Sequence, residues 1–407
     1  MRIAIFTESY EPIINGVSVC VSTLRDGLAA RGHEVFVFAP AFEGHLDESD
    51  RVFRLPARHT FLMPDYPFPV PFAPEMKRRF AALKLDIVHT QTPFLLGVLG
   101  AKWARQYGVP FVATNHTLYT EYAHYVPVRP KALTKWFLTQ LMRWYYSGAD
   151  AVVVPSRPVE KILRSYGVKT RIEVIKTGID PIPASTPENR EAVRRHYGVG
   201  KGILSSSNIL SSSKDGFLLL YVGRIAREKN LRMLLTAFKT VASSHDSTKL
   251  LLVGGGPALA ETKAFAAGLG LGDRIEFAGM LKRREIDPIY GAADAFAFPS
   301  TTETQGIAIC EALSAGLPVV AVNAGGIPEN IQHGVDGFLT NDDPAEFADR
   351  IAYLIDHPAD RAAMSARARA NACNFSIDRM VDDFERFYES VIAGTAGEAK
   401  VAGSFGI

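Results

Sequence analysis

Short apolar runs alternate with helix-length segments along most of this 407-residue chain, and this alternation limits what the chain can fold into. In the first half, five such runs are found at residues 2–7, 34–40, 86–91, 110–116 and 151–156. Helix-length segments such as Val19–Arg31 and Val98–Tyr107 separate them. Continuous apolar strands in this rhythm are typical of a parallel sheet covered by helices on both faces. The pattern predicts an α/β fold.

The second half repeats the pattern, with apolar runs at residues 217–223, 249–256, 274–279, 295–300, 318–323 and 337–340. A chain of this length with 47% hydrophobic residues can bury two sizeable cores. We therefore expect two doubly wound domains, followed by a helix that crosses back to the first domain and by a disordered tail. The predicted bounds are 1–180 and 181–378 for the domains, with a flexible Ser-rich excursion at 200–216, 379–393 for the helix and 394–407 for the tail.

The cysteines and the N-terminal sequence indicate in which cellular compartment the protein is expected. Cys20, Cys310 and Cys373 are scattered singly, without metal-binding spacing or an even-numbered disulfide framework. The first strand meets Glu8 too early for a signal peptide, and no run of eighteen apolar residues predicts a transmembrane helix. We expect a cytoplasmic protein, either soluble or bound to the inner face of the cell membrane.

Charge is unevenly distributed, although the net charge is only +2. Residues 1–180 hold 22 Lys and Arg against 16 Asp and Glu, and within Lys77–Arg143 the count is 10 against 2. Such an excess implies an anionic partner, either nucleic acid or an anionic lipid surface. No zinc-finger spacing, nucleic-acid-binding signature or basic tail supports nucleic acid, so an anionic membrane is the favoured partner.

Two glutamates lie close together around the strand-to-helix connection near residue 300. Glu303 follows the apolar run at 295–300, and Glu311 lies about a turn and a half inside the next helix, after Gly306. A helix N-terminus attracts anions, but two carboxylates would repel a bare phosphate. Neutral hydroxyl donors such as ribose and sugar hydroxyls are therefore their predicted targets. The alternative is that Glu303 complements the helix dipole and Glu311 is a solvated helix residue.

Other candidate residues follow other predicted strands, where ligands of open α/β sheets bind. Asn15 and Gly16 end the loop after the first strand, and a helix is expected to start near Val17, an arrangement that presents backbone N–H groups. Arg224 and Lys229 follow the strand at 217–223, where cations suit a pyrophosphate, although any surface loop carries such charges. His116 ends the strand at 110–116, as a structural or a catalytic histidine.

Taken together, these motifs resemble a family 4 retaining glycosyltransferase of the GT-B fold. The resemblance covers most of the chain and rests on the loop ending at Gly16, GRIAREKN at 223–230, LLLVGGGP at 250–257, and ETQGIAICEALSAGLPVVAVNAGGIPENI at 303–331. It implies two Rossmann-like domains that face an interdomain cleft. NHTLYTEYAHYVP at 115–127, together with ETQG, where many members have Phe in place of Gln305, is most similar to the branch that transfers glucose to diacylglycerol.

The resemblance also implies roles for the candidate residues. Arg224, Lys229 and the backbone N–H of Gly16 would hold the donor pyrophosphate. Glu311 would accept hydrogen bonds from ribose, and Met280 would pack on the base unless it is buried. Glu303, His116 and the backbone around Gln305, Gly306 and Ile307 would contact the donor sugar. The leaving phosphate itself would take the acceptor proton, and the chain contains no Asp-x-Asp, so we expect no metal and no other cofactor.

The acceptor and the membrane are expected at residues 129–146, which are basic, aromatic and amphipathic. The candidate residues are Tyr119, Tyr122, Lys131, Lys135 and Trp136. The alternative is that these aromatic side chains pack on the first sheet. The proline-rich run Phe61–Phe72 could likewise admit acyl chains or fold against its own domain.

Four functions remain open from the sequence. The favoured one is a glycolipid synthase that moves a hexose, expected to be glucose from UDP-glucose, to a lipid such as 1,2-diacylglycerol. A second is a transferase of the same family with a soluble sugar or sugar-phosphate acceptor, or a mannosyltransferase acting on a phospholipid. A dinucleotide oxidoreductase is disfavoured because Leu259 occupies the third glycine position of its fingerprint. A catalytically silent nucleic-acid-binding protein is disfavoured by the complete set Arg224, Lys229, Glu303 and Glu311.

Overall fold

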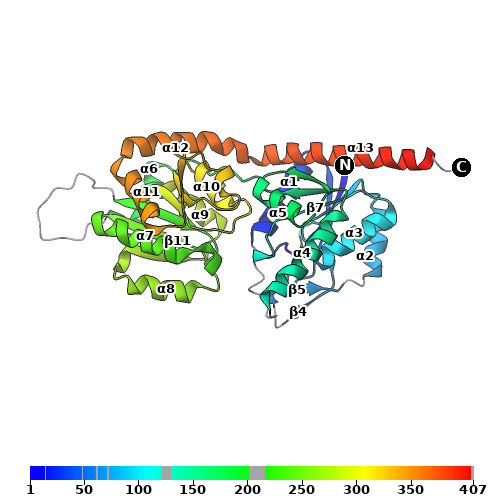
Figure 1. The fold of residues 1–407 in the computed structure, drawn as a ribbon, viewed down its shortest axis with the longest axis horizontal. Coiled ribbons are helices and arrows are strands. Elements are labelled where there is room, and N and C mark those ends of the chain that lie inside the picture. Colours follow the sequence, from blue (N-terminus) through cyan, green and yellow to red (C-terminus); the bar gives the residue numbers. More distant parts are fainter. Residues whose placement is uncertain are drawn as a thin grey trace, which may run out of the picture. The chain divides into compact units, whose positions relative to one another are not determined.

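The computed structural model describes residues 1–13, 15–47, 49–60, 63–70, 73–121, 130–200 and 216–404. These form two compact units, which divide between Gly178 and Ile179, close to the predicted boundary at residue 180. The first unit also contains the C-terminal segment that starts at Ile377. In each unit, helices surround the strands (Figure 1). The predicted excursion at 200–216 lies outside the described residues except for its two end residues.

The first unit contains a seven-stranded parallel sheet with the order β3-β2-β1-β6-β7-β8-β9. Its strands are β1 (Arg2–Phe6), β2 (Glu34–Pro40), β3 (Val52–Leu55), β6 (Ile87–Thr90), β7 (Phe111–Thr114), β8 (Ala151–Val154) and β9 (Arg171–Val174). A separate antiparallel hairpin is formed by β4 (Ala57–Thr60) and β5 (Met63–Pro69). All five runs predicted for this half are strands of the sheet.

Helices cover both faces of this sheet because successive side chains of a strand point to opposite faces. From β1, Ile3 and Ile5 pack with residues of α1 (Gly16–Ala30) and α13 (Ile377–Ser404). Ala4 and Phe6 belong to the core on the other face. That core is completed by residues of α2 (Pro74–Ala82), α3 (Leu95–Tyr107), α4 (Lys131–Ser147) and α5 (Arg157–Ser165).

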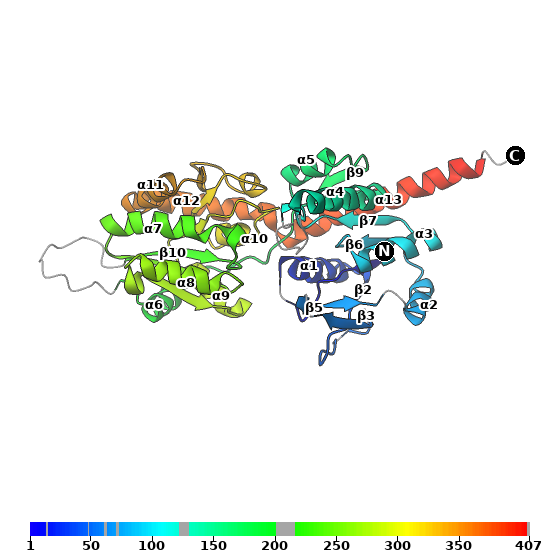
Figure 2. The same cartoon turned by 60° about the horizontal axis from the view of Figure 1, so that its bottom comes forward.

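The second unit is built on a six-stranded parallel sheet with the order β12-β11-β10-β13-β14-β15, and Figure 2 shows β10 with helices on both sides of it. Its strands are β10 (Phe217–Val222), β11 (Thr248–Val253), β12 (Ile275–Gly279), β13 (Ala295–Phe298), β14 (Val319–Val322) and β15 (Gly337–Thr340). Its α-helices are α6 (Pro187–His196), α7 (Leu231–Ser244), α8 (Leu259–Gly268), α9 (Arg283–Ala292), α10 (Ile307–Ser314), α11 (Pro344–Asp356) and α12 (Pro358–Ala372). Short 3-10 turns are η2 (Arg227–Lys229), η3 (Gly272–Arg274), η4 (Ile327–Glu329) and η5 (Cys373–Phe375).

The C-terminal helix packs in the first unit and differs from the prediction at its end. Phe384 and Tyr388 of α13 are buried in the core that also contains Ile3 and Ile5. The helix continues to Ser404, so residues 394–404 are helical rather than part of a disordered tail. This segment contains three alanines and three glycines, and a helix that has already formed extends by further residues more easily than a new helix starts.

Three glycines after β11 let two loops of the second unit approach each other backbone to backbone. Gly254 has a φ of 136°, and a Cβ atom there would lie 2.0 Å from the Gly223 carbonyl oxygen. The Ile225 N–H donates to the carbonyl of Gly255 over 2.8 Å. The Gly-rich sequence at 254–256 therefore holds the loop after β10, which carries Arg224 and Lys229. This packing role accounts for the three glycines without a dinucleotide-binding function.

Replacing Gly254 tests this close approach. We expect Gly254→Ala to destabilise the second unit by about 2 kcal/mol or more, because the backbone conformation excludes a side chain and the new Cβ collides with a carbonyl oxygen. Calorimetric unfolding measures the effect. Gly268→Ala is the matched control, since a Cβ there meets no atom within 4 Å and the residue ends helix α8. Equal stability of Gly254→Ala and the wild type would contradict the interpretation.

Candidate active site

Lys229 and Glu303 contact each other at the edge of the second sheet, where the connections that follow two neighbouring strands lead to opposite sides. Strands β10 and β13 are neighbours, but the chain runs on from β10 to β11 and from β13 to β14, which lie on opposite sides. Ligands of open α/β sheets bind at the carboxyl ends of strands at such a point. Lys229 lies in the loop after β10, and its Nζ donates to Oε1 of Glu303 in the loop after β13. Both side chains are mostly buried, with exposed fractions of 16% and 14%.

A second loop holds the backbone of Glu303 in place. The Gly326 N–H donates to the Glu303 carbonyl oxygen over 2.8 Å, and a Cβ on Gly325 would lie 2.3 Å from that same oxygen. The buried side chain of Asn330 donates through Nδ2 to the Gln305 carbonyl oxygen. These three residues were quoted in the sequence motif but were assigned no role there. They fix the position of the loop that carries Glu303.

Helix α10 starts directly after Gly306, in the stretch whose backbone is predicted to contact the donor sugar. Gly306 is the residue before the helix and has a left-handed φ of 86°, which a side chain would disfavour. No side chain caps this helix end, and Ile307 is its first residue. The side chain of Gln305 is buried, 3.8 Å from the sulfur of Cys310. The Gln305 side chain therefore packs inside the second unit.

Glu311 is held from two sides and is not a solvated helix residue. Arg283 donates through Nη1 to Glu311 Oε1, and the buried Tyr290 donates through Oη to Oε2 over 2.9 Å. Arg283 also forms an ion pair of 2.9 Å with Asp287. The sequence analysis missed Arg283 and Tyr290, which lie on helix α9 rather than in the motif. Because a cation and a phenol already orient it, Glu311 has a fixed direction for hydrogen bonding.

Arg224 and Met280 are exposed members of the predicted donor site. The side chain of Arg224 is 56% exposed and lies 3.9 Å from Glu228. Met280 is 79% exposed, which excludes the buried alternative. Its side chain lies over the glycine loop, because a Cβ on Gly255 would be 2.8 Å from Met280 Cγ. A flexible, polarisable side chain in this position can pack against a flat ring.

In the first unit, helix α1 starts at Gly16, one residue before the start predicted near Val17. Asn15 caps the helix, and its Oδ1 accepts hydrogen bonds from the amides of Val17 and Ser18 over 3.0 and 2.9 Å. These two amides are therefore engaged within the chain. The predicted anion contact of this helix depends on the remaining first-turn amide, that of Gly16.

His116 is held by a hydrogen-bond network that reaches helix α13. His116 Nε2 and Gln91 Oε1 are 2.7 Å apart. Gln91 Nε2 lies 3.1 Å from Nδ1 of the buried His89, which is also 2.6 Å from the hydroxyl of Tyr388. His89 Nε2 is 2.6 Å from Thr114 Oγ1. Since the amide nitrogen of Gln91 donates to His89, its oxygen accepts, and His116 carries its proton on Nε2.

Both histidines of this network are neutral at neutral pH. Burial lowers the pKa of His116 to about 4. Burial, and secondarily the nearby His116, lower the pKa of His89 to about 3. His116 therefore offers hydrogen bonds rather than a positive charge. The sequence analysis missed Gln91, His89 and Tyr388, although two polar residues inside the apolar run at 86–91 were a signal that could have indicated them.

The residues predicted for the acceptor and the membrane have different surroundings. The ring of Tyr119 packs edge-on against Phe94, with centroids 5.0 Å apart. Lys131 begins helix α4, and Lys135 forms an exposed ion pair of 3.3 Å with Glu121. Trp136 is 60% exposed. Tyr122 and the proline-rich ends 61–62 and 71–72 lie outside the described residues.

In chemical terms, the second unit combines two cations with two oriented carboxylates. Arg224 and Lys229 can stabilise a negatively charged leaving group, and the carboxylates of Glu303 and Glu311 can accept from hydroxyl groups. Within the described ranges, no three His, Cys, Asp or Glu side chains are grouped so that they could hold a metal ion. The arrangement suits a neutral polyhydroxyl compound linked to a phosphate or pyrophosphate.

Family models match both units. Residues 14–182 match the model described as Glycosyltransferase Family 4, and residues 205–371 match Glycosyl transferases group 1. Among solved structures, a sucrose-phosphate synthase from Thermosynechococcus elongatus is similar with a TM-score of 0.78 and 22% identity, covering 97% of this chain and 100% of that one. Anabaena HepE in complex with UDP and glucose gives a TM-score of 0.75 and 21% identity, covering 96% and 100%. These likenesses show the GT-B fold.

Named proteins of similar sequence support the same family. The chain is 34% identical to the alpha-monoglucosyldiacylglycerol synthase of Streptococcus pneumoniae, over 79% of this chain and 71% of that protein. It is 28% identical to the protein of the same name from Acholeplasma laidlawii, over 96% and 98%. A GDP-mannose-dependent alpha-mannosyltransferase of Mycobacterium tuberculosis is also 28% identical, over 96% and 97%. The chain belongs to the family 4 glycosyltransferases of the GT-B fold and is a nucleotide-sugar-dependent hexosyltransferase.

Proposed function

We propose that this enzyme transfers glucose from UDP-glucose, with retention of configuration, to the free hydroxyl of a lipid such as 1,2-diacylglycerol at the membrane surface. The observation that carries the donor half of the proposal is the pairing of Lys229 with Glu303 at the divergence point of the second sheet. The names of the relatives from S. pneumoniae and A. laidlawii support the lipid acceptor.

The proposed reaction exchanges one bond of the sugar for another. The bond from the anomeric carbon to the diphosphate oxygen breaks, and a bond to the acceptor oxygen forms on the same face. The acceptor proton passes to the departing phosphate oxygen. Lys229 and Arg224 stabilise the charge that develops on the diphosphate, and Glu303 holds sugar hydroxyls. Lys229 is paired with Glu303, so a bound pyrophosphate would compete for the lysine and release the carboxylate.

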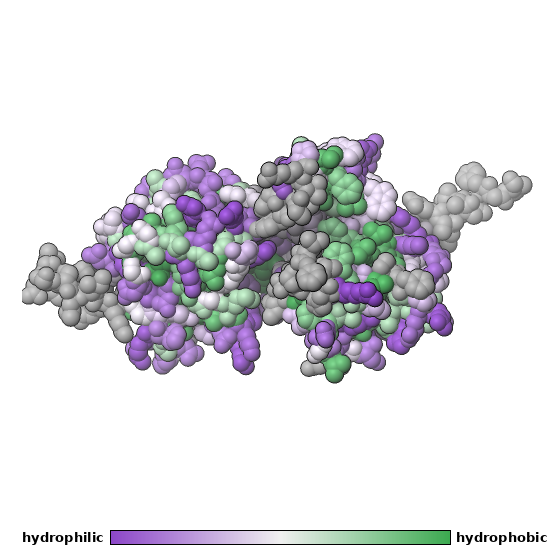
Figure 3. Space-filling model, turned by 90° about the horizontal axis from the view of Figure 1, so that it is seen from below, coloured by the Kyte–Doolittle hydropathy of each residue, from purple (hydrophilic) through white to green (hydrophobic). Residues whose placement is uncertain are grey.

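The proposed lipid acceptor is supported by an exposed apolar face on helix α4. Leu133, Trp136, Phe137 and Trp144 are each more than half exposed, whereas Tyr145 of the same helix is buried. The aromatic residues of this segment are therefore divided between the core and the surface. Figure 3 shows hydrophobic residues gathered on the surface of the first unit. Large exposed apolar side chains on one helix are typical of a site that binds a protein or a membrane.

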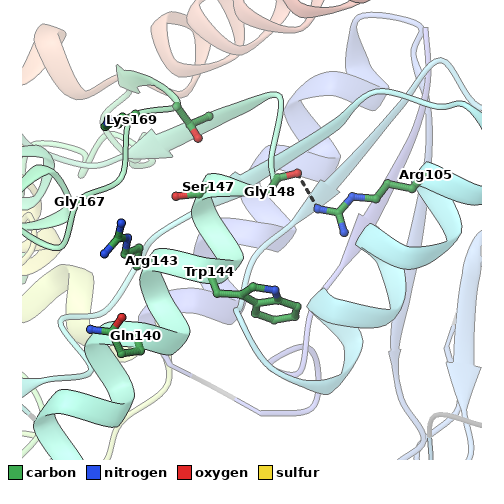
Figure 4. Close-up of a pocket in the computed structure, with 9 residues that line it drawn as sticks. Arg105, Gln140, Arg143, Trp144, Ser147, Gly148, Gly167 and Lys169 are labelled. Atoms are coloured by element: carbon green, nitrogen blue, oxygen red, sulfur yellow. Dashed lines mark hydrogen bonds between the residues drawn. The ribbon is translucent and has the colours of Figure 1, made fainter.

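Cations lie beside this face. A surface pocket at the end of α4 is lined by Arg105, Arg143 and Lys169 together with Trp144. In Figure 4, Arg143 and Trp144 project from α4, and Arg105 donates to the Gly148 carbonyl oxygen over 2.8 Å. Guanidinium groups next to an interfacial tryptophan suit the negatively charged headgroups of a membrane surface. None of the described helices combines the length and apolarity needed to cross a bilayer.

A second function is favoured by one specific similarity. The mannosyltransferase of M. tuberculosis matches 96% of the chain, so a GDP-mannose donor with a phospholipid acceptor is the alternative. A soluble sugar or sugar-phosphate acceptor is the other alternative.

A screen of nucleotide sugars tests the proposal. Purified enzyme is incubated with UDP-glucose, UDP-galactose or GDP-mannose and with 1,2-dioleoylglycerol in vesicles, a phospholipid, or soluble sugars, and the products are identified by mass spectrometry and by the anomeric NMR coupling. The proposal expects α-glucosyl-dioleoylglycerol from UDP-glucose. The Lys229→Ala protein is the negative control. Transfer only from GDP-mannose, or only to a soluble acceptor, would replace this proposal with the corresponding alternative.

Membrane attachment is tested separately by vesicle sedimentation. We expect the wild type to bind anionic vesicles at low salt, to bind purely zwitterionic vesicles weakly, and to be released at roughly 1 M salt, where the Debye length falls to about 3 Å. The double variant Trp136→Ala, Phe137→Ala should bind at least about tenfold more weakly, because it loses most of the apolar area of the exposed face. A quintuple variant should not bind these vesicles. In it, glutamine replaces Lys77, Arg78, Arg79, Lys131 and Lys135.

Leu46→Ala is the matched control, because Leu46 is 91% exposed but lies outside helix α4. It should sediment like the wild type. If the α4 double variant also sediments like the wild type, or if the wild type ignores anionic lipid, the soluble-acceptor alternative becomes the better account.

A further inference from the structure

The carboxyl group of Glu8 has one satisfied and one unsatisfied oxygen. Glu8 follows β1, and its Oε1 accepts from the Leu96 amide at the start of helix α3 over 2.6 Å. Its Oε2 is buried and makes no hydrogen bond to any described residue. Buried polar atoms in native proteins almost always have partners, so such an atom requires an explanation.

Two further unsatisfied atoms lie at the same edge of the sheet. Thr92 follows β6 and Asn115 follows β7, and the hydroxyl of Thr92 and the side-chain oxygen of Asn115 are buried without a hydrogen bond within the described residues. Strands β1, β6 and β7 are consecutive neighbours in the sheet. Connections diverge between β1 and β6, because the chain continues from β1 to β2 and from β6 to β7. This is the ligand-binding point of the first sheet.

We infer that Glu8, Thr92 and Asn115 form a hydroxyl-binding site that positions the acceptor substrate. This inference rests on the proposed function, and it adds the class of acceptor. A carboxylate oxygen and an amide oxygen accept hydrogen bonds, and a threonine hydroxyl donates or accepts. The three together suit a compound that brings hydroxyl donors. These three groups include no cation that could compensate for the charge of a phosphate, so the reacting end of the acceptor is a neutral alcohol such as the glycerol end of a diacylglycerol.

Apolar surface adjoins this site. Phe94 and Leu95, at the start of α3, are 38% and 37% exposed, and the Phe94 ring packs against Tyr119. A polar site next to exposed apolar side chains matches a molecule with a hydroxyl end and a hydrocarbon part. The side chain of Glu8 is itself partly exposed, and the last torsion of a glutamate has a broad energy minimum, so a small rotation turns Oε2 outward.

The raised pKa of Glu8 agrees with a buried carboxyl group that lacks some of its hydrogen-bond partners. Burial raises the pKa of Glu8 to about 7, and the amides of Leu96 and Gly97 act in the opposite direction. The titratable groups that face it are the phenols of Tyr119 and Tyr145, whose pKa values are raised by burial, so both stay neutral. The alternative to a ligand site is a structural site filled by bound water.

The variant Thr92→Val distinguishes a ligand site from a structural water site, because it removes only the hydroxyl. A ligand site predicts that the KM for 1,2-dioleoylglycerol rises about 2- to 10-fold, while the affinity for UDP and the thermal unfolding midpoint do not fall. A structural water site predicts a lower unfolding midpoint. Thr248→Val is the matched control, since Thr248 also has a buried unpaired hydroxyl but begins strand β11 in the second unit. It should leave the acceptor KM unchanged.

Glu8→Gln adds a pH-dependent test. The folded protein holds the Glu8 proton up to about pH 7 and the unfolded chain releases it near 4.5, so the wild type loses stability as the pH rises between these values. The variant lacks this loss. Its unfolding midpoint should exceed that of the wild type increasingly from pH 5 to pH 8, and its acceptor KM should rise by about tenfold or more.

An unchanged acceptor KM in both variants would overturn the inference, as would a lower unfolding midpoint of Thr92→Val. If the wild type uses a soluble alcohol instead of dioleoylglycerol, the same comparison is made with that acceptor. A wild type that binds UDP but transfers to no acceptor contradicts the proposed function, and the inference fails with it.

Discussion

The ion pair between Lys229 and Glu303 joins the two loops that carry most of the predicted donor-binding residues. A lysine and a glutamate that are both mostly buried stabilise a structure only when each finds a partner, so each fixes the other. The position of the pair follows from the sheet: parallel strands place all their carboxyl ends at one edge, and the diverging connections of β10 and β13 leave room there for a ligand. Because Gly254 and Gly325 have no side chain, the neighbouring backbone can lie directly against these loops.

The candidate functional side chains of both units are held in place by neighbouring residues. Glu311 is held by Arg283 and Tyr290, and His116 is held through Gln91 and His89. Groups that already point in the required direction do not have to be reorganised during the reaction, which is where much of the rate enhancement of transferases is expected to arise. One side-chain oxygen of each of Glu8, Thr92 and Asn115 differs, because it has no hydrogen-bond partner among the described residues, and a substrate could supply one.

Much of this organisation could be predicted from the sequence because it is local. The apolar runs identify the strands, and Gly306 and the two glutamates lie within one continuous motif. The partners that orient these residues could not be predicted, because they are distant in the chain: Arg283 meets Glu311 from another helix, and Tyr388 reaches His89 from α13. The same limit applied to helix α4, where periodicity alone did not separate the buried Tyr145 from the exposed Trp136. Nor did composition show that residues 394–404 continue a helix.

The central claim is that the two glutamates hold different parts of one nucleotide sugar, and calorimetric titration with UDP tests it most directly. UDP contains the ribose and the pyrophosphate but no sugar. Glu311→Gln should therefore weaken UDP binding by about 10-fold or more, since a charged hydrogen-bond acceptor for ribose is lost. Glu303→Gln should bind UDP at least as tightly as the wild type, because Lys229 is released from its partner and is free to contact the pyrophosphate. Wild-type affinity in Glu311→Gln, or a loss of UDP binding in Glu303→Gln, would contradict the account.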